Sequence, residues 1–225
     1  KAFYKPRGAW RLWAPFIRAK AGLGRVDEDA PHGYHDKAYL FMDVAVIGGG
    51  PAGMSAALAA AEAGADVLLI DETPMLGGAL NYARFDAAGA VAAAERQRLS
   101  AAVGAHANIE VMTGTVANGW FADNFLSLIR GNRMFKLRAK EVVLATGVME
   151  QPVVFRNNDL PRVMMGSAAQ RLIRLYGVRP GSRAVVVTAN DDGYGVALDL
   201  VDAGVEVAAV ADLRDQPGSG LLAVA

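Results

Sequence analysis

The sequence contains no cysteine among its 225 residues. That absence excludes disulfide bonds, thiolate-bound zinc, cysteine-ligated iron–sulfur clusters and dithiol exchange. The chain also carries no formal net charge, because 23 basic residues balance 23 acidic residues. No overall electrostatic field therefore draws the protein to nucleic acid or to anionic lipid, and we expect neither among its partners.

Long hydrophobic runs are missing as well, since none approaches the ~18 residues that a membrane span requires. The first residues lack the charged-then-apolar pattern of a secretory signal, so the expected location is cytoplasmic. The 53% apolar composition is enough for a substantial core. Because the sequence starts at Lys1 and ends with the apolar stretch 221–225, we expect a piece of a longer polypeptide.

The rest of the chain is organised around residues 44–72. Residues 44–47 (VAVI) are typical of a parallel strand buried on both faces, and a GxGxxG loop on Gly48, Gly50 and Gly53 follows at once. In such a loop the first glycine makes the tight turn, the second lets the main chain approach a pyrophosphate, and the third lets the helix pack close to the strand.

A helix is expected to begin near Pro51, since proline suits the first helical position, and to end at Gly64. Residues 67–70 (VLLI) predict the second strand, after which Asp71 or Glu72 could accept ribose hydroxyls. Phosphates would lie on the free N–H groups at the start of the helix. The alternative is a strand-to-helix turn without a ligand, because glycine-rich turns are common.

The remainder of this half predicts a complete nucleotide domain. Gly77 and Gly78 could bring a loop near a dinucleotide or form an ordinary turn. The expected elements are a helix at 87–103, a parallel strand at 109–112, a meander of three short strands at 113–121, 125–130 and 134–138, and a last parallel strand at 142–144 that runs into Ala145, Thr146 and Gly147.

The second half repeats the pattern in degenerate form. Ser167 is expected to cap a helix that ends near Tyr176, and strands at 184–187 and 205–210 flank a further helix, with Asp212 following the second strand as Asp71 follows its own. The loop between the strands reads TANDDG, so Thr188 and Asn190 replace the first two loop glycines. Two aspartates add negative charge where a pyrophosphate would lie, and both sterics and electrostatics oppose dinucleotide binding there.

These patterns define an α/β fold: a Rossmann-like FAD/NAD(P)-binding domain with an inserted β-meander, followed by a second, partial and degenerate Rossmann-like domain. The expected boundaries are a basic, aromatic arm and connector at 1–40, the dinucleotide-binding domain at 41–155, and the second domain at 156–225. In the arm Pro15 should interrupt any long helix, and its tryptophans and arginines either pack on their own domain or dock a partner subunit. His32 and His35 lie in a loop with no evident third ligand, so no metal site is expected.

The motif GGGPAG, the pair Asp71–Glu72, the glycines after Leu76, and the ATG at 145–147 followed by Pro152 together resemble the glutathione-reductase-type flavoprotein fold across residues 41–214. A closer resemblance is to the alpha subunits of heterotetrameric sarcosine oxidases. The stretches that carry it are YKPRGAW, ATGVMEQPVVFRNNDLP, RLIRLYGVRPG and TANDDGYGVALDLVDAGVEVAAV. Dye-linked proline dehydrogenases and opine or cyanide-forming amine dehydrogenases look similar.

The resemblance implies a division of labour among subunits. A flavin-carrying beta subunit would oxidise a small secondary amine to an imine, smaller subunits would complete the complex, and FMN would lie near the alpha–beta interface. The alpha subunit would hold NAD, or alternatively FAD, in the site that ordinarily takes FAD. A folate-binding domain would lie beyond the end of this chain.

The residues that the resemblance assigns to cofactor binding fall into five groups, and no catalytic residue is assigned. They are Gly48, Gly49, Gly50, Pro51, Ala52 and Gly53 for the pyrophosphate, Asp71 and Glu72 for the ribose, Gly77 and Gly78 in the neighbouring loop, Thr115 and Val116 near the adenine, and Ala145, Thr146 and Gly147 closing over the dinucleotide. Two alternatives stay open. One is a self-contained FAD-dependent pyridine-nucleotide oxidoreductase, against which the TANDDG loop speaks, and the other is a non-catalytic assembly module.

Overall fold

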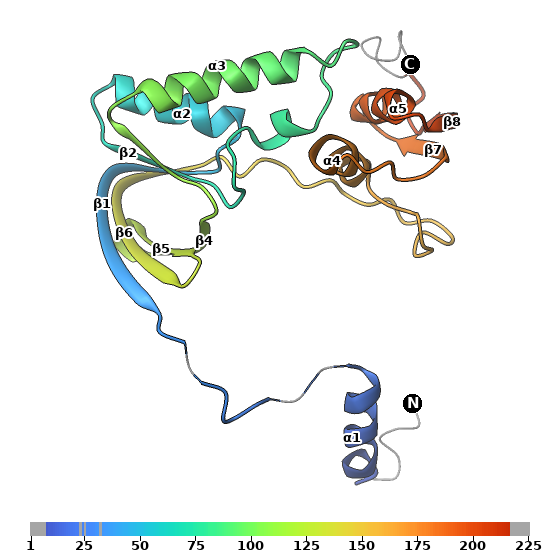
Figure 1. The fold of residues 1–225 in the computed structure, drawn as a ribbon, viewed down its shortest axis with the longest axis horizontal. Coiled ribbons are helices and arrows are strands. Elements are labelled where there is room, and N and C mark those ends of the chain that lie inside the picture. Colours follow the sequence, from blue (N-terminus) through green and yellow to red (C-terminus); the bar gives the residue numbers. More distant parts are fainter. Residues whose placement is uncertain (1–7, 23, 25, 32, 217–225) are drawn as a thin grey trace. The chain divides into compact units, whose positions relative to one another are not determined.

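The structure is a computed structural model that describes residues 8–22, 24, 26–31 and 33–216 (Figure 1). His32 and the apolar stretch 221–225, on which two sequence-based expectations fall, lie outside the described residues. The chain divides into two compact units, Lys1–Tyr34 and His35–Ala225. Our expected boundaries at residues 40 and 155 stay predictions, and the second of them falls inside the second unit.

The described residues of the first unit include the helix α1 (Trp10–Lys20), with Pro15 inside it. We expected Pro15 to interrupt a long helix, but α1 continues through it. A proline removes only one main-chain N–H donor, and the hydrogen bond from Ala21 N to Ile17 O (2.8 Å) keeps the following turn helical. No described residue of α1 is buried, so its aromatic side chains face solvent within this unit.

The second unit is built on a sheet of six strands. In chain order they are β1 (Asp36–Ile47), β2 (Val67–Ile70), β3 (Ile109–Met112), β4 (Val116–Phe121), β5 (Phe125–Arg130) and β6 (Arg133–Leu144). Their spatial order is β3-β2-β1-β6-β5-β4. The pairs from β3 to β6 are parallel, while β6–β5 and β5–β4 are antiparallel. Consecutive parallel strands joined through helices are typical of nucleotide-binding folds.

Strands β1 and β6 are longer than predicted. The sequence suggested a strand at 44–47 and two separate strands at 134–138 and 142–144, whereas the structure has one continuous β6 that pairs in parallel with β1 from Asp36↔Arg133 to Ile47↔Leu144. The last strand of the meander and the last parallel strand are therefore the same strand. The polar residues between them suggested a break, but Lys140 instead reaches Asp43 across the sheet at 2.6 Å.

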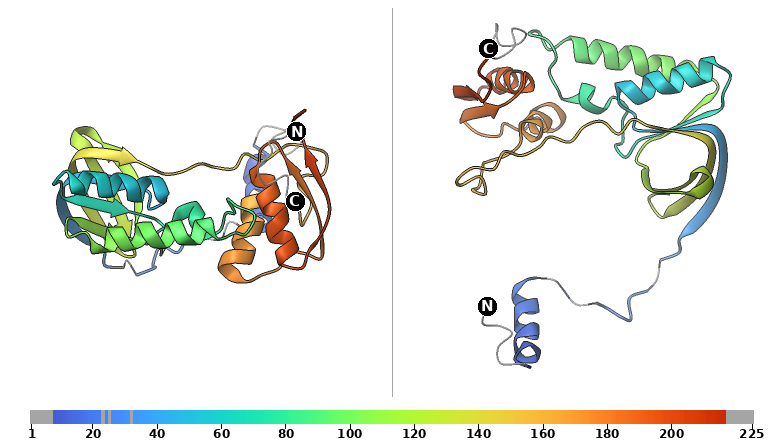
Figure 2. Two further views of the ribbon diagram at one scale, coloured as in Figure 1. Left: turned by 90° about the horizontal axis from the view of Figure 1, so that it is seen from above. Right: turned by 180° about the vertical axis from the view of Figure 1, so that it is seen from behind.

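Helices cover one face of the parallel strands. Helices α2 (Pro51–Glu62) and α3 (Val91–Ala105) run side by side in Figure 2, and the short helix η1 (Gly78–Asn81) precedes α3. A core containing Val46, Met54, Leu69, Leu99 and Val103 lies beneath them. Helix α3 starts later than the predicted Ala87, because the Asp86 carboxylate accepts the N–H groups of Ala90 (3.3 Å) and Val91 (3.1 Å).

The other face of the sheet is packed by the meander itself. Its buried leucines, Leu126, Leu128 and Leu137, join Leu68 and Ile70 in a second core cluster. The curvature of β1 and β6 in Figure 1 allows the meander strands to fold over the parallel strands. The meander thus replaces the second helical layer that a doubly wound sheet would need at this position.

The later part of the chain contains α4 (Gly166–Tyr176), β7 (Arg183–Thr188), α5 (Asp192–Asp202) and β8 (Glu206–Asp212). Strands β7 and β8 pair in parallel, and Val186, Val196, Ala197, Leu200 and Val205 form their core with α5. This β-α-β unit and the larger sheet confirm the predicted α/β fold class. Strand β8 extends two residues beyond the predicted end at Val210.

Helix α4 is capped from a distance rather than by Ser167. Its N-cap residue, Met165, provides no side-chain hydrogen bond. The Glu150 carboxylate instead accepts the N–H groups of Gly166 and Ser167, both at 2.9 Å. A negative carboxylate at this end also interacts favourably with the helix dipole. The expected cap was wrong because Ser167 is already the second residue of the helix.

Replacing Leu137 tests whether β6 is one strand of the core. Leu137 is fully buried, so Leu137→Ala should lower the free energy of unfolding by about 2–5 kcal/mol through lost burial and a residual cavity. Leu144→Ala is the matched control on the same strand, because Leu144 is 58% exposed and its loss should cost at most about 0.5 kcal/mol. Chemical denaturation would measure both values, and equal losses would contradict the structure.

Candidate functional site

The end of β1 meets the end of β6 at Gly48. The N–H of Gly48 donates to Ile70 O at 2.8 Å, and the N–H of Ala145 donates to Ile47 O at 2.8 Å. Gly48 has φ = +111°, and a Cβ atom there would lie 2.2 Å from Ala145 O. Only glycine fits this position, because both the backbone conformation and the neighbouring carbonyl exclude a side chain.

Gly53 brings helix α2 onto the loop. A Cβ atom at Gly53 would lie 1.7 Å from the carbonyl oxygen of Gly48, well inside van der Waals contact. Pro51 occupies the first turn of α2, and Gly50 before it provides no side-chain cap. The first N–H groups of the helix therefore have no partner inside the helix, and they lie at its positive end. This arrangement suits an anion such as a pyrophosphate.

Gly77 and Gly78 pack against the same loop. The N–H of Gly77 donates to Gly49 O at 2.8 Å. A Cβ atom at Gly78 would lie 2.9 Å from the Cα atom of Gly50, whereas one at Gly50 itself would meet nothing closer than Gly78 Cα at 3.9 Å. The structure therefore brings the two glycine segments together. Gly50 is the loop glycine at which a side chain could be added without a steric clash.

The two acidic candidates differ in their surroundings. Asp71 is buried, and its carboxylate accepts hydrogen bonds from Gly49 N (2.5 Å), Thr73 N (2.7 Å) and Thr73 Oγ1 (2.5 Å). Asp71 thus joins the end of β2 to the glycine loop. Glu72 is exposed, so its carboxylate is open to a ligand. Asp71 has a structural role in the loop whether or not it also contacts a ribose.

The remaining predicted site residues occupy mixed positions. Thr115 is buried, with its N–H donating to Asp71 O (2.9 Å) and its hydroxyl to Thr113 O (3.1 Å). Val116 begins β4 and is exposed. Ala145 touches the glycine loop, while Thr146 and Gly147 lie exposed after it. The structure therefore brings Ala145 to the glycine loop and Thr115 to Asp71, and places Val116, Thr146 and Gly147 at the surface.

The second loop, between β7 and α5, is closed by its own side chains. The hydroxyl of Thr188 donates to Asn190 O (2.8 Å), and the amide of Asn190 donates to Asp192 Oδ2 (3.0 Å). A Cβ atom at Gly193 would lie 2.3 Å from Thr188 Cβ. Gly193 thus packs α5 onto its strand as Gly53 packs α2, but side chains fill the turn.

Arg214 joins the two acids of this second loop region. Its guanidinium donates to Asp191 Oδ1 (2.8 Å) and to Asp212 Oδ2 (2.7 Å), and the hydroxyl of Tyr194 also donates to Asp212 Oδ2 (2.9 Å). Hydrogen bonding to Arg214 holds the pKa of Asp212 well below its ordinary value of 3.8. Burial, together with the bond to Asp212, raises the pKa of Tyr194.

Sequence reasoning identified Asp212 by its place after β8 but missed Tyr194 and Arg214. The available signal was Arg214 itself, a cation two residues after an acid at a strand end. The Asp212 carboxylate already accepts hydrogen bonds from Tyr194 and Arg214, so it is poorly placed to accept hydrogen bonds from ribose hydroxyls. The network therefore supports the sequence-based expectation of a degenerate second site.

A buried ion-pair network connects the segment after η1 with α4 and α5. Asp199 is fully buried and accepts from Arg84 Nη1 (3.2 Å), Gln170 Nε2 (2.9 Å) and Arg174 Nη2 (2.5 Å). Arg84 also pairs with Asp202 at 2.5 Å. Three donors, two of them arginines, give both oxygens of this buried carboxylate a partner and compensate its charge.

The described residues lack two other features. They contain no group of three or more His, Asp or Glu side chains arranged to hold a metal ion. No helix in the part of the chain that the structure describes is long and apolar enough to cross a membrane.

Comparison with known proteins gives the family context for this site. The profile of the pyridine nucleotide-disulphide oxidoreductase family matches residues 42–221. Among solved structures, L-proline dehydrogenase from P. horikoshii superimposes with a TM-score of 0.68 and 28% sequence identity, covering 85% of this chain and 40% of that one.

Two curated relatives are subunits of oxidases. The chain is 36% identical to the alpha subunit of sarcosine oxidase from Rhizobium meliloti (strain 1021), over 97% of this chain and 24% of that protein. It is 31% identical to an opine oxidase subunit from Agrobacterium tumefaciens (strain Ach5), over 80% of this chain and 38% of that protein. The chain thus spans about a quarter of the length of the sarcosine oxidase relative.

Arg214→Met should reduce stability in a pH-dependent way. Because the pKa of folded Asp212 is depressed, its contribution to the free energy of unfolding is present above the ordinary value of 3.8 and lost as pH falls below it. The variant should therefore unfold at a lower temperature than the wild type at pH 7, and the difference should narrow at pH 2.5. Arg183→Met, which removes an exposed pair with Glu206, is the control and should change the unfolding temperature little at either pH. If the difference in unfolding temperature between Arg214→Met and the wild type did not change with pH, the pairing of Arg214 with Asp212 would be contradicted.

Proposed function

We infer the function of this chain from its family, since it belongs to the pyridine nucleotide-disulphide oxidoreductase family over residues 42–221. Its resemblance to sarcosine oxidase alpha subunits is confirmed by homologues that are 36% identical over 97% and 86% of the chain. We propose that the chain is the dinucleotide-binding part of the alpha subunit of a multi-subunit secondary-amine oxidase or dehydrogenase.

The observation that carries the proposal is the cradle at the end of β1. The cradle is formed by main-chain atoms of Gly48, Gly50 and Gly53, and neither Gly48 nor Gly53 has room for a side chain. The start of α2, which has no side-chain cap, points into it. A pyrophosphate fits these donors because they are main-chain N–H groups at a positive helix end. The same cradle would accept the ADP half of either NAD or FAD. NAD is the proposed occupant and FAD the alternative.

The chain's own residues would bind and orient the dinucleotide. The N–H groups of Ala52 and Gly53 would hold the pyrophosphate, exposed Glu72 would accept ribose hydroxyls, and Asp71 would fix Gly49 in the bound geometry. Thr115 and Val116 would lie near the adenine, and residues 145–147 would close over the dinucleotide. A bound nicotinamide or flavin ring supplies two-electron hydride chemistry. No catalytic residue is proposed on this chain.

Amine oxidation would occur with partner subunits. The proposed partners are a flavin-carrying beta subunit, with smaller subunits beside it, FMN near a subunit interface and a small secondary amine as substrate. Support comes from the relatives, whose names describe them as subunits of sarcosine and opine oxidases. The exposed aromatic residues of α1, Trp10 and Phe16, together with Arg11 and Arg18, would serve as one such contact.

Nucleotide release distinguishes the proposed function from its alternatives. The purified protein would be denatured and the supernatant analysed by mass spectrometry, with one equivalent of NAD per chain expected. Released FAD would overturn the NAD assignment and favour a self-contained flavin enzyme. A protein without any nucleotide would contradict the proposal and favour an assembly module.

A substitution at Gly50 should abolish binding while preserving the fold. Gly50→Trp adds a Cβ atom whose nearest neighbour is Gly78 Cα at 3.9 Å, so the chain should fold normally while the indole fills the space proposed for the pyrophosphate. We expect at least a tenfold drop in bound nucleotide at an unchanged unfolding temperature, after allowing for the stabilisation that the ligand itself provides. Gly104→Trp is the matched control, because a Cβ atom at exposed Gly104 meets nothing within 4 Å. Full nucleotide content in Gly50→Trp would place the ligand elsewhere.

A further inference from the structure

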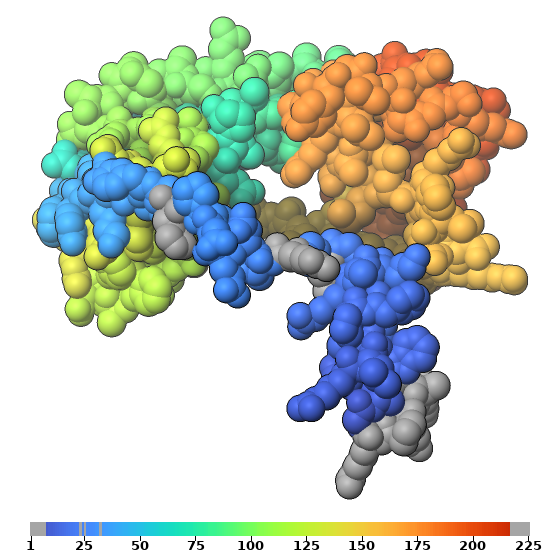
Figure 3. Space-filling model, turned by 60° about the horizontal axis from the view of Figure 1, so that its bottom comes forward, coloured from blue at the N-terminus to red at the C-terminus, as the bar shows by residue number. Residues whose placement is uncertain are grey.

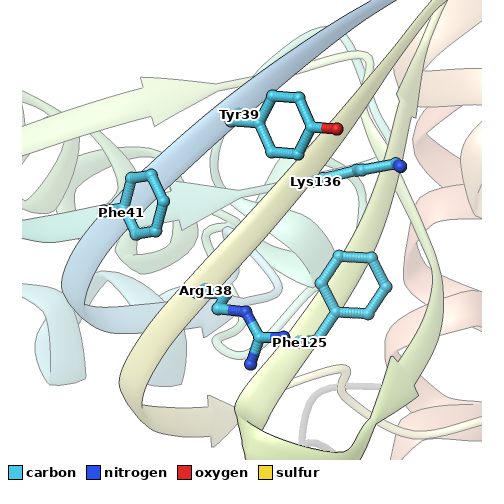
Figure 4. Close-up of a pocket in the computed structure, with 5 residues that line it drawn as sticks. All are labelled: Tyr39, Phe41, Phe125, Lys136 and Arg138. Atoms are coloured by element: carbon cyan, nitrogen blue, oxygen red, sulfur yellow. The ribbon is translucent and has the colours of Figure 1, made fainter.

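The part of the sheet formed by β1, β6 and β5 has one face of aromatic and cationic side chains. Figure 4 shows the five residues that line a shallow groove on it, which we call the aromatic–cationic face: Tyr39, Phe41, Phe125, Lys136 and Arg138. The strand register explains their proximity, since Tyr39 pairs with Lys136 while Phe41 and Phe125 both pair with Arg138. Side chains of paired residues lie on the same face of a sheet.

This face is not needed for the core of the chain. The alternate residues of the same strands, including Leu40, Leu126 and Leu137, point to the opposite side and pack in the core. Tyr39 and Phe41 are by contrast 66% and 73% exposed. In Figure 3 the residues of β1 and those of the meander lie side by side at the surface. Large apolar side chains gathered on an exposed face mark an interaction site more often than scattered ones do.

The apolar part of the face continues along the meander. The ring of Phe121 on β4 lies 5.5 Å from that of Phe125, and Phe121 is itself 57% exposed. Val116 and Ile129, a cross-strand pair, are exposed further along the same two strands. Apolar side chains of β4 and β5 therefore lie on both sides of Ser127, the residue that pairs with Lys136.

The cations are held in position by the rings. Lys136 Nζ lies 5.3 Å from the ring centroid of Tyr39, and Arg138 Cζ lies 5.7 Å from that of Phe125. Among the described residues, Arg138 pairs only with the exposed Asp123, at 3.4 Å. An exposed pair of this length contributes little, so both cations have donors available for an incoming anion.

The dimensions of the groove indicate the kind of ligand. Its volume is about 260 Å³, below the ~300–1,000 Å³ of pockets that enclose small molecules. A shallow groove of this size accommodates a few side chains of another polypeptide. Lys136 and Arg138 are two residues apart on one strand, so their Cα atoms are about 7 Å apart, a spacing that two carboxylates of one segment can match.

We propose that the aromatic–cationic face docks a partner polypeptide through an extended acidic segment whose carboxylates and apolar side chains share one face. The carboxylates would pair with Lys136 and Arg138, and the apolar side chains would cover Tyr39, Phe41 and Phe125. Aromatic and arginine side chains are favoured anchors at protein interfaces, and complementary charge sets their register. The inference builds on the proposed function only in that a member of a multi-subunit complex requires such surfaces.

Charge makes three other occupants less suitable. A second copy offering α1 would bring Arg11 and Arg18 against Lys136 and Arg138. Nucleic acid binding draws on many phosphate contacts, whereas this groove offers two cations on a chain of zero net charge. An anionic membrane surface would likewise need a larger basic patch.

The test uses the full chain and a fluorescein-labelled peptide of twelve residues in which Glu, Phe and Leu occupy alternate positions and Ser occupies the positions between them, so that all the large side chains share one face. Fluorescence anisotropy should show saturable binding that weakens at higher salt, and at least tenfold weaker binding to the Lys136→Glu/Arg138→Glu double variant. Arg179→Glu, an exposed charge reversal outside the sheet, is the matched control and should bind as the wild type does. The same peptide with Lys in place of Glu should not bind.

Several outcomes would overturn the proposal. These are equal binding of the acidic and basic peptides, unchanged binding by the double variant, tighter binding of a twelve-nucleotide oligothymidine or of vesicles with anionic lipid, or a dimer that the double variant abolishes. Thermal unfolding of each variant checks its fold. Nucleotide released from the same preparations reports separately on the glycine cradle, so a failure of the docking inference and a failure of the proposed function are distinguishable.

Discussion

The contact between Gly53 and the carbonyl of Gly48 is the constraint on which the first half of the molecule depends. Helix α2 can approach β1 only because Gly53 carries no side chain, and the missing side chain of Gly48 leaves room for the Ala145 carbonyl. The same close approach lets Ala145, at the end of β6, complete the turn. Asp71 then fastens the loop by accepting the Gly49 N–H. Packing between glycines therefore forms the cradle at the N-terminal end of α2. The free main-chain N–H groups at this end are already in position without a ligand.

The residues 44–72 were predictable from sequence because their geometry is local. The positive φ of Gly48 and the contact of Gly53 with Gly48 both lie within one β-α-β unit, and the following strand and acid come in the same order in the structure. The placement of Asp71 was less predictable, because its partners are main-chain groups of a loop 22 residues earlier. Because the Asp71 carboxylate already accepts the Gly49 N–H, the exposed carboxylate of Glu72 is the more accessible of the two to a ligand.

Long-range pairing explains what the sequence did not reveal. The first residues of β1 are a strand because they pair with β6, and Asp36 reaches Arg133 across 97 positions of the chain. A local window over 134–144 contains a polar interruption, so one strand looked like two. The cap of α4 by Glu150 and the closure of the second loop by Arg214 likewise depend on residues that only the fold brings together.

The length of β1 has a thermodynamic consequence. Its Ile47 end opens into the glycine loop, while Tyr39 belongs to the aromatic–cationic face, and the eight residue-to-residue steps from Tyr39 to Ile47 span roughly 26 Å of strand. Perturbations this far apart with no shared neighbours generally have additive energies. Occupancy at one end should therefore be uncoupled from occupancy at the other, and an assembly built on this chain could survive the loss of its dinucleotide.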